Sequence, residues 1–202
     1  MGWNKKALVA LIGSVCMAGA TTALAGPSAK AMADTCAGCH GTNGQSIGPA
    51  SPNLAGMSAS YFIDSMKGFK ALEKDVQHAD GARPATIMNR IAKGYSDEQI
   101  EAMGEYFEKL GVYKANVPHD AAKAKAGAEV YESACAKCHD EGGSLPGDDA
   151  GILAGQWLPW LQFSMADFKE GHREMPKKMK KQVDKLSDAE IDAVLNYFAS
   201  QK

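Results

Sequence analysis

Apolar residues recur along this chain at intervals of three and four residues, the spacing that places them on one face of an α-helix. From this pattern and from shorter apolar stretches, helices are predicted over residues 27–35, 62–70, 100–110, 120–134, 161–169 and 191–198. The sequence therefore predicts an all-α fold.

The second half of the chain repeats the first. The middle helices correspond at an offset of 99 residues, through the pairs Phe62/Leu161, Ser65/Ser164, Met66/Met165, Phe69/Phe168 and Lys70/Lys169. Further on, Tyr106-Phe107 recurs as Tyr197-Phe198, at an offset of 91. The first half therefore carries eight extra residues, which we assign to the polar stretch 73–83. The repeat predicts two tandem domains related by internal duplication.

The last helix of each half begins with the same signal. Ser96 is followed three residues later by Gln99, and Ser187 is followed by Glu190. In such a capping box the serine oxygen accepts from a free backbone N–H, and the later side chain reaches back to the backbone of the serine. Both helices are therefore predicted to start at these serines. Each has one apolar face that is expected to be buried: Ile100, Met103, Phe107 and Leu110 in the first, and Ile191, Val194, Leu195 and Phe198 in the second.

The boundary between the halves is predicted from a helix stop. Gly111 ends the last helix of the first half, and residues 112–121 are assigned to a linker. The domains are then residues 26–111 and 122–202. Each has fewer than 90 residues, a size at which a domain is marginally stable without a disulfide, a metal or a cofactor.

The most specific motif in the chain is C-x-x-C-H. It occurs as Cys36-Ala37-Gly38-Cys39-His40 and, 99 positions later, as Cys135-Ala136-Lys137-Cys138-His139. In this motif the two thiols bond to the vinyl groups of a haem, and the histidine becomes the proximal iron ligand. We therefore expect two covalent haems, attached through Cys36, Cys39, Cys135 and Cys138, with His40 and His139 as proximal ligands.

Other interpretations of these cysteines fit less well. The two C-x-x-C pairs of a zinc site normally lie about 15–20 residues apart. A thioredoxin-like redox site has one such pair beside a βαβ pattern, without a histidine after each copy. A disulfide scaffold would scatter its cysteines, whereas four of the five lie in the two motifs.

The sixth iron ligand is predicted from the repeat. Met88 and Met179 each lie eight residues before a capping serine. Met66 and Met165 also correspond, but they belong to the apolar face of a middle helix, so we assign them to packing. Met175 competes with Met179 for the second haem, and the repeat favours Met179.

Bis-histidine ligation is the alternative to histidine–methionine ligation. It is disfavoured because His78, His119 and His172 do not correspond between the halves, and we expect them to be loop or solvated histidines. Histidine–methionine ligation fills both axial positions with protein atoms. Such an iron suits one-electron transfer rather than activation of oxygen or peroxide.

Residues near the haems add further expectations. Pro52 lies where its carbonyl is expected to accept a hydrogen bond from the proximal imidazole of the first haem, which raises the basicity of the ligand. Gly151 stands at the corresponding position of the second half, so the second site needs a different arrangement. Trp157 and Trp160 are predicted to pack against haem rather than to relay electrons.

A cluster of four lysines surrounds Met179: Lys177, Lys178, Lys180 and Lys181. The cluster could be a docking patch for an acidic partner. We favour the simpler interpretation, a solvated helix face.

The first 25 residues have the features of a secretory signal peptide. Lys5 and Lys6 precede an apolar run over residues 7–20, and Ala23-Leu24-Ala25 is a cleavage signal. Cys16 lies within the run, but no small residue directly precedes it, which disfavours a lipoprotein. We expect a mature chain that begins at Gly26 in the bacterial periplasm, where haem attachment also takes place. Without the signal lysines the formal net charge falls from −2 to −4, and nothing indicates the basic face typical of nucleic-acid binding.

Several longer strings resemble the dihaem cytochrome subunit of flavocytochrome c sulfide dehydrogenase. They are Cys36-Ala37-Gly38-Cys39-His40-Gly41, Gly48-Pro49-Ala50-Ser51-Pro52, Ile87-Met88-Asn89-Arg90-Ile91-Ala92-Lys93-Gly94-Tyr95-Ser96 and Ile152-Leu153-Ala154-Gly155-Gln156-Trp157. The resemblance extends over essentially the whole mature chain.

That resemblance implies the axial pairs His40/Met88 and His139/Met179. It also implies a heterodimer in which a separate subunit carries FAD and oxidises sulfide. The present chain, not an enzyme on its own, would then pass the electrons to a soluble periplasmic carrier. A free-standing dihaem carrier that feeds a terminal oxidase is the alternative. A dihaem peroxidase fits less well, because it needs an iron that can open a site for peroxide.

Overall fold

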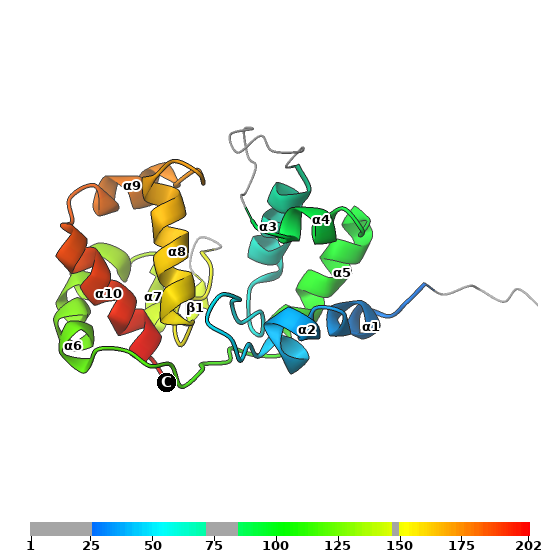
Figure 1. The fold of residues 1–202 in the computed structure, drawn as a ribbon, viewed down its shortest axis with the longest axis horizontal. Helices are drawn as coiled ribbons and strands as arrows, with labels where there is room; N and C mark the ends of the chain where they lie inside the picture. The colour runs from blue at the N-terminus through cyan, green and yellow to red at the C-terminus, as the bar shows by residue number, and fades with distance from the viewer. Residues whose placement is uncertain (1–25, 72–84, 147–149) are drawn as a thin grey trace, which may run out of the picture.

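The computed structural model describes residues 26–71, 85–146 and 150–202. Figure 1 shows two helical bodies side by side, joined along one edge by an extended segment. The predicted signal peptide (1–25) and the whole stretch expected to hold the eight extra residues (73–83), with His78, lie outside the described residues. No helix of the described residues is long and apolar enough to cross a membrane.

The first half contains five α-helices and one 3₁₀ turn among the described residues: α1 (Ala29–Asp34), α2 (Ala37–His40), η1 (Thr42–Gly44), α3 (Ala59–Ala71), α4 (Met88–Ala92) and α5 (Asp97–Glu108). The second half repeats this plan as α6 (Ala121–Val130), the π-helical turn η2 (Tyr131–Cys135), α7 (Asp140–Gly143), α8 (Leu158–Lys169), α9 (Lys177–Val183) and α10 (Asp188–Ser200), with one two-residue strand, β1 (Leu145–Pro146). The predicted all-α fold is confirmed.

Both predicted capping boxes are present. The Ser96 N–H donates to Gln99 Oε1 at 2.9 Å, and the Gln99 N–H donates back to Ser96 Oγ at 3.2 Å. The matching distances for Ser187 and Glu190 are 2.8 and 3.3 Å. Such a cap contributes about 1 kcal/mol of stability, and here it fixes the start of α5 and of α10.

The core of the first half lies where α1 and α3 pack against α5. Ile100, Met103 and Phe107 of α5 are fully buried. The rings of Phe62 and Phe107 lie 5.3 Å apart, between centroids. Leu110 was expected on this buried face but is 38% exposed, because α5 ends at Glu108, before another turn can carry Leu110 inward.

The core of the second half is built on the contact between α6 and α10. The four residues of α10 predicted to be buried are buried: Ile191, Val194, Leu195 and Phe198. Tyr131, at the end of α6, stacks on Tyr197 with the ring centroids 4.7 Å apart. The two helices approach closely at Gly127, where an added Cβ would lie 2.1 Å from the carbonyl oxygen of Ala193.

The segment between the halves packs against the second half. Ala115 and Val117 are buried in its core, and the Ala115 N–H donates to the Gly155 carbonyl at 3.1 Å. Asp120 caps α6 by accepting from the Ala122 and Lys123 N–H groups at 2.8 and 3.0 Å. Helix α6 therefore begins at Ala121, the last residue that the sequence assigned to the linker.

The close approach of α6 and α10 gives a first prediction. On helix propensity alone, Gly127→Ala would stabilise an exposed helix by about 1 kcal/mol. Because its Cβ meets the backbone of α10, we expect instead a destabilisation of about 1–3 kcal/mol, measured by chemical denaturation of the haem-loaded protein. The exposed position Ala126 is the control: Ala126→Gly should lose only the propensity difference. A stabilised Gly127→Ala variant would contradict the observed packing.

Candidate haem sites

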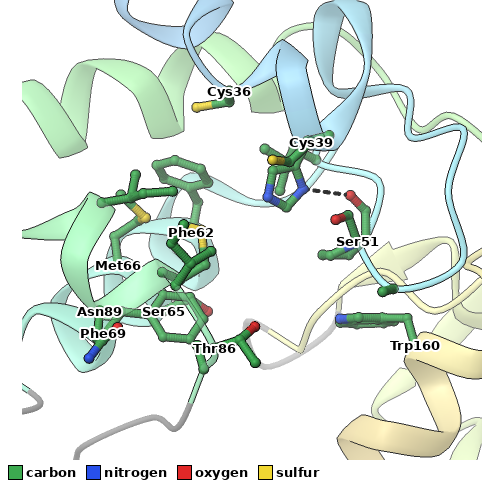
Figure 2. A pocket seen from close by; sticks show the side chains of 18 of the residues that line it. Cys36, Cys39, Ser51, Phe62, Ser65, Met66, Phe69, Thr86, Asn89 and Trp160 are labelled. Atoms are coloured by element: carbon green, nitrogen blue, oxygen red, sulfur yellow. Dashed lines mark hydrogen bonds between the residues drawn. The ribbon is translucent and has the colours of Figure 1, made fainter.

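A cavity of about 940 Å³ lies beside the first C-x-x-C-H motif. Cys36, Cys39 and His40 line it from α2 and its N-cap, while Phe62 and Met66 line it from α3 (Figure 2). Helix α4 closes a further side with Met88 and Ile91. A mostly apolar cavity with two thiols and an imidazole in its wall has the chemistry needed to hold a covalently attached haem.

The two thiols come from one short helical turn. Cys36 is the N-cap of α2 and Cys39 lies three residues later, so the helical spacing brings the two onto neighbouring positions. Burial raises the pKa of the Cys36 thiol above its ordinary value, while Cys39 is exposed. The same turn ends at His40, which ties the position of the imidazole to that of the thiols.

His40 is held in one orientation by its predicted partner. Its side chain is buried, and its Nδ1–H donates to the Pro52 carbonyl at 2.9 Å, the dashed line in Figure 2. Burial lowers the pKa of His40, partly opposed by this hydrogen bond. The ring is therefore neutral at pH 7, and its Nε2 is left free to ligate a metal. The contact predicted between Pro52 and the imidazole is confirmed.

Two methionines reach the first cavity. Met88, which the repeat selects, is the first residue of α4 and is partly buried. Met66, assigned to packing, is 4% exposed and belongs to the first core, yet it also lines the cavity. The structure brings both sulfur-bearing side chains to the wall of one site.

The second motif has a different hydrogen-bond environment. Cys135 ends η2, and burial raises the pKa of its thiol to about 11. Burial also lowers the pKa of His139. The buried His139 Nδ1 has no hydrogen-bond partner in the described part of the chain, unlike its counterpart in the first half.

Packing between the halves explains why Gly151 stands where the first half has a proline. A Cβ added to Gly151 would lie 2.7 Å from Cζ of Tyr61, a residue of the first half. A proline ring has no room there. The sequence predicted that the second site departs from the first, and the aromatic side chain of the opposite half is the physical reason.

The segment predicted to supply the sixth ligand of the second site lies on and before α9. Helix α9 packs against η2, which ends at Cys135. Met175 and Met179 are both partly buried. The four lysines around Met179 are exposed, and Lys180 pairs with Asp184 at 2.8 Å.

Several side chains of the second half line the first cavity, and the sequence did not predict this. They are Trp160, Phe163, Ser164, Asp167 and His172. Figure 2 shows Trp160 beside the loop that carries Ser51. The repeat shows which positions of the two halves correspond, but it does not indicate which residues of one half contact the other. Trp160, expected to pack against the haem of its own half, thus belongs to both the second core and the first cavity wall.

The remaining tryptophan and histidines are also placed. Trp157 Nε1 donates to the Ser46 carbonyl of the first half at 3.1 Å. His119 Nδ1 donates to the Val117 carbonyl at 2.8 Å. His172 lies in the loop after α8, as predicted, with its Nδ1 3.3 Å from a carboxylate oxygen of Glu170.

Known families match both halves. The family described as "Cytochrome c" matches residues 27–111, and the family described as "Cytochrome C oxidase, cbb3-type, subunit III" matches residues 122–198. A cytochrome c4 from Pseudomonas aeruginosa is 30% identical over 205 residues, which cover 95% of this chain and 96% of the relative. The crystal structure of a reduced recombinant cytochrome c4 from Pseudomonas stutzeri superposes with a TM-score of 0.73, at 24% identity, over 88% of this chain and all of that chain.

The names of two further relatives refer to dehydrogenases of sulfur compounds. A thiosulfate dehydrogenase electron acceptor from Thiomonas intermedia is 29% identical, over 96% of this chain and 89% of the relative. A cytochrome subunit of sulfide dehydrogenase from Chlorobaculum tepidum is 40% identical over 76 residues, which cover 38% of this chain and 60% of the relative.

Two haem-type domains in tandem, each built around a C-x-x-C-H motif, define an electron-transfer cytochrome. The chain belongs to the dihaem cytochrome c family, and its fold is that of cytochrome c4. Two cytochrome c domains imply haem c as the cofactor. The relatives are electron carriers or electron-acceptor subunits, so this chain is not a catalytic enzyme itself.

The presence of two methionines in one cavity gives a second prediction. Met88→Leu should remove about half of the near-infrared sulfur-to-iron absorption of the ferric protein, because Met88 is predicted to make one of the two iron–sulfur bonds. Met66→Leu, a matched change in the same cavity, should keep the band. The same comparison applies to Met179→Leu and Met175→Leu. Loss of the band in Met66→Leu or Met175→Leu alone would reverse the corresponding assignment.

Proposed function

We propose that this chain is a periplasmic dihaem electron-transfer subunit. It accepts electrons from a sulfide-oxidising FAD subunit and passes them to a soluble carrier. The observation that carries the electron-transfer part is the first cavity, where the wall offers a hydrogen-bonded imidazole and a methionine besides the two thiols. When bound, the haem supplies reversible one-electron chemistry.

The residues that would hold the two haems follow from the motifs and the repeat. Covalent attachment is assigned to Cys36, Cys39, Cys135 and Cys138. The axial pairs are His40 with Met88 and His139 with Met179. In each pair a neutral imidazole and a thioether would fill both axial positions, so substrate sulfur has no open position on either iron.

The chemistry of sulfide makes a second redox group necessary. Oxidation of sulfide to elemental sulfur removes two electrons, whereas each haem iron takes one. A flavin takes the pair and releases its electrons singly. Two haem sites in one chain suit this division, with one electron to each site before onward transfer.

The sulfide-dehydrogenase assignment is supported by the motif strings shared with that family and by the Chlorobaculum tepidum relative. This relative is aligned over 76 residues, 38% of the chain. A second candidate is a free-standing dihaem carrier that feeds a terminal oxidase. The observation in its favour is the similarity to cytochrome c4 along nearly the whole of both chains.

Periplasmic location is proposed from the signal-like segment over residues 1–25. The lysine cluster on α9 remains a candidate docking patch near the second haem. Its exposure suits either docking or simple solvation, and the ion pair of Lys180 with Asp184 neutralises part of its charge.

The partner proposal predicts that sulfide reduces the haems quickly only when the flavoprotein is present. The purified, haem-loaded chain is mixed with sulfide in a stopped-flow instrument, with and without a purified sulfide-oxidising FAD subunit, and haem reduction is followed by absorbance. Thiosulfate with its own dehydrogenase serves as the comparison donor. We expect a large acceleration by the sulfide-oxidising flavoprotein. Equal rates with and without that subunit would sink the proposal and favour the free-standing carrier.

A further inference from the structure

The loop that follows the first C-x-x-C-H motif is hydrogen-bonded to the second half, and the side chain of Gln156 makes two of these bonds. Gln156 precedes α8 and is 1% exposed, and Asn53 in the loop is also 1% exposed. The Asn53 N–H donates to Gln156 Oε1 at 2.8 Å, and Gln156 Nε2 donates to the Asn53 carbonyl at 3.0 Å. One side-chain amide therefore satisfies both main-chain groups of Asn53.

The side chain of Asn53 is fixed as well. Its Oδ1 accepts from the Ser46 N–H at 2.9 Å, and its Nδ2 donates to the Gly155 carbonyl at 3.2 Å. The backbone of this loop is thus held from both halves, in a buried position where a lost hydrogen bond costs more than on the surface.

The peptide bond between Pro52 and Asn53 links this contact to the proximal histidine. Its carbonyl is that of Pro52, which accepts from His40 Nδ1 at 2.9 Å. Its amide is the Asn53 N–H, which donates to Gln156 at 2.8 Å. Because the C=O and N–H of one peptide are conjugated, donation by the amide makes the carbonyl a better acceptor, and hydrogen bonds in series strengthen one another.

We propose that Gln156, a residue of the second half, is a positioning residue for the proximal ligand of the first haem. It orients the peptide between Pro52 and Asn53 and strengthens the hydrogen bond that His40 Nδ1–H donates to the carbonyl of that peptide. A stronger bond to Nδ1–H raises the basicity of the imidazole. This stabilises ferric over ferrous iron and lowers the reduction potential of the first haem.

The described part of the first half has no residue that plays the role of Gln156 for the second haem site. The residue of the first half that corresponds to Gln156 is Met57. Its side chain has no amide group that could form the same pair of hydrogen bonds with the backbone of the second half. The counterpart of Pro52 is Gly151, and His139 Nδ1 has no partner among the described residues. The second half therefore tunes the first haem without a reciprocal contact, whichever protein supplies the electrons.

The test is a redox titration of the full-length, haem-loaded protein, with Gln156→Leu as the main variant. Leucine keeps the side chain similar in size but cannot accept from the Asn53 amide. We expect one of the two haem potentials to rise and the other to stay. In the reduced protein, the Nδ1–H resonance of His40 should also shift upfield, as a weaker hydrogen bond requires. No sulfide or flavoprotein is needed, so this result is independent of the partner proposal.

Two further variants test whether Gln156 acts specifically on His40 or whether any weakening of the contact between the halves has the same effect. Trp157→Phe removes the 3.1 Å hydrogen bond to Ser46 across the same contact but keeps an aromatic ring, and it should leave the His40 Nδ1–H resonance unchanged. Gln156→Glu keeps an acceptor for the Asn53 amide and should not raise the potential, and it tests the proposal even if Gln156→Leu fails to fold. Unchanged potentials and resonance in Gln156→Leu, a rise of the potential in Gln156→Glu, or an equal upfield shift of the His40 resonance in Trp157→Phe would each overturn the proposal.

Discussion

The structure depends on one constraint: each small half must be stabilised around the group that its C-x-x-C-H motif attaches. A cavity of about 940 Å³ lies between α2, α3 and α4 of the first half and is also lined by residues of α8 from the second half. A domain of fewer than 90 residues buries little apolar side-chain surface, so an empty cavity of this volume would leave it with too small a core. The haem that two cytochrome c domains imply would therefore be part of the core, and the thiols and the imidazole proposed to hold it would also stabilise the fold.

Local features of the structure were predictable from the sequence. Helices α1, α3, α5, α6, α8 and α10 follow from short-range patterns, as do the capping boxes at Ser96 and Ser187, and the bond from His40 to Pro52 follows from a motif with a known geometry. Leu110 was assigned to a buried face because periodicity continues past the end of α5, whereas the helix stops at Glu108. Periodicity reports which face of a helix is apolar, but not where the last turn ends.

The contacts between the halves were not predictable. Gln156 lies against Asn53, Tyr61 blocks the position of Gly151, and Trp160 reaches the wall of the first cavity. These residues carry no spacing signal, because their partners lie about a hundred positions away in the other copy. They also make the two sites unequal, since duplication produced two similar domains and the interface between them then modified each site differently.

The central claim is that both irons are held by protein atoms on both faces, so that the chain only transfers electrons. Low-temperature electron paramagnetic resonance of the resting ferric protein tests this most directly, because the spin state reports whether an axial position is open. The account predicts two low-spin haems per chain and no stoichiometric high-spin signal. A high-spin haem in the resting protein would contradict it, because that iron would have a position open to substrate.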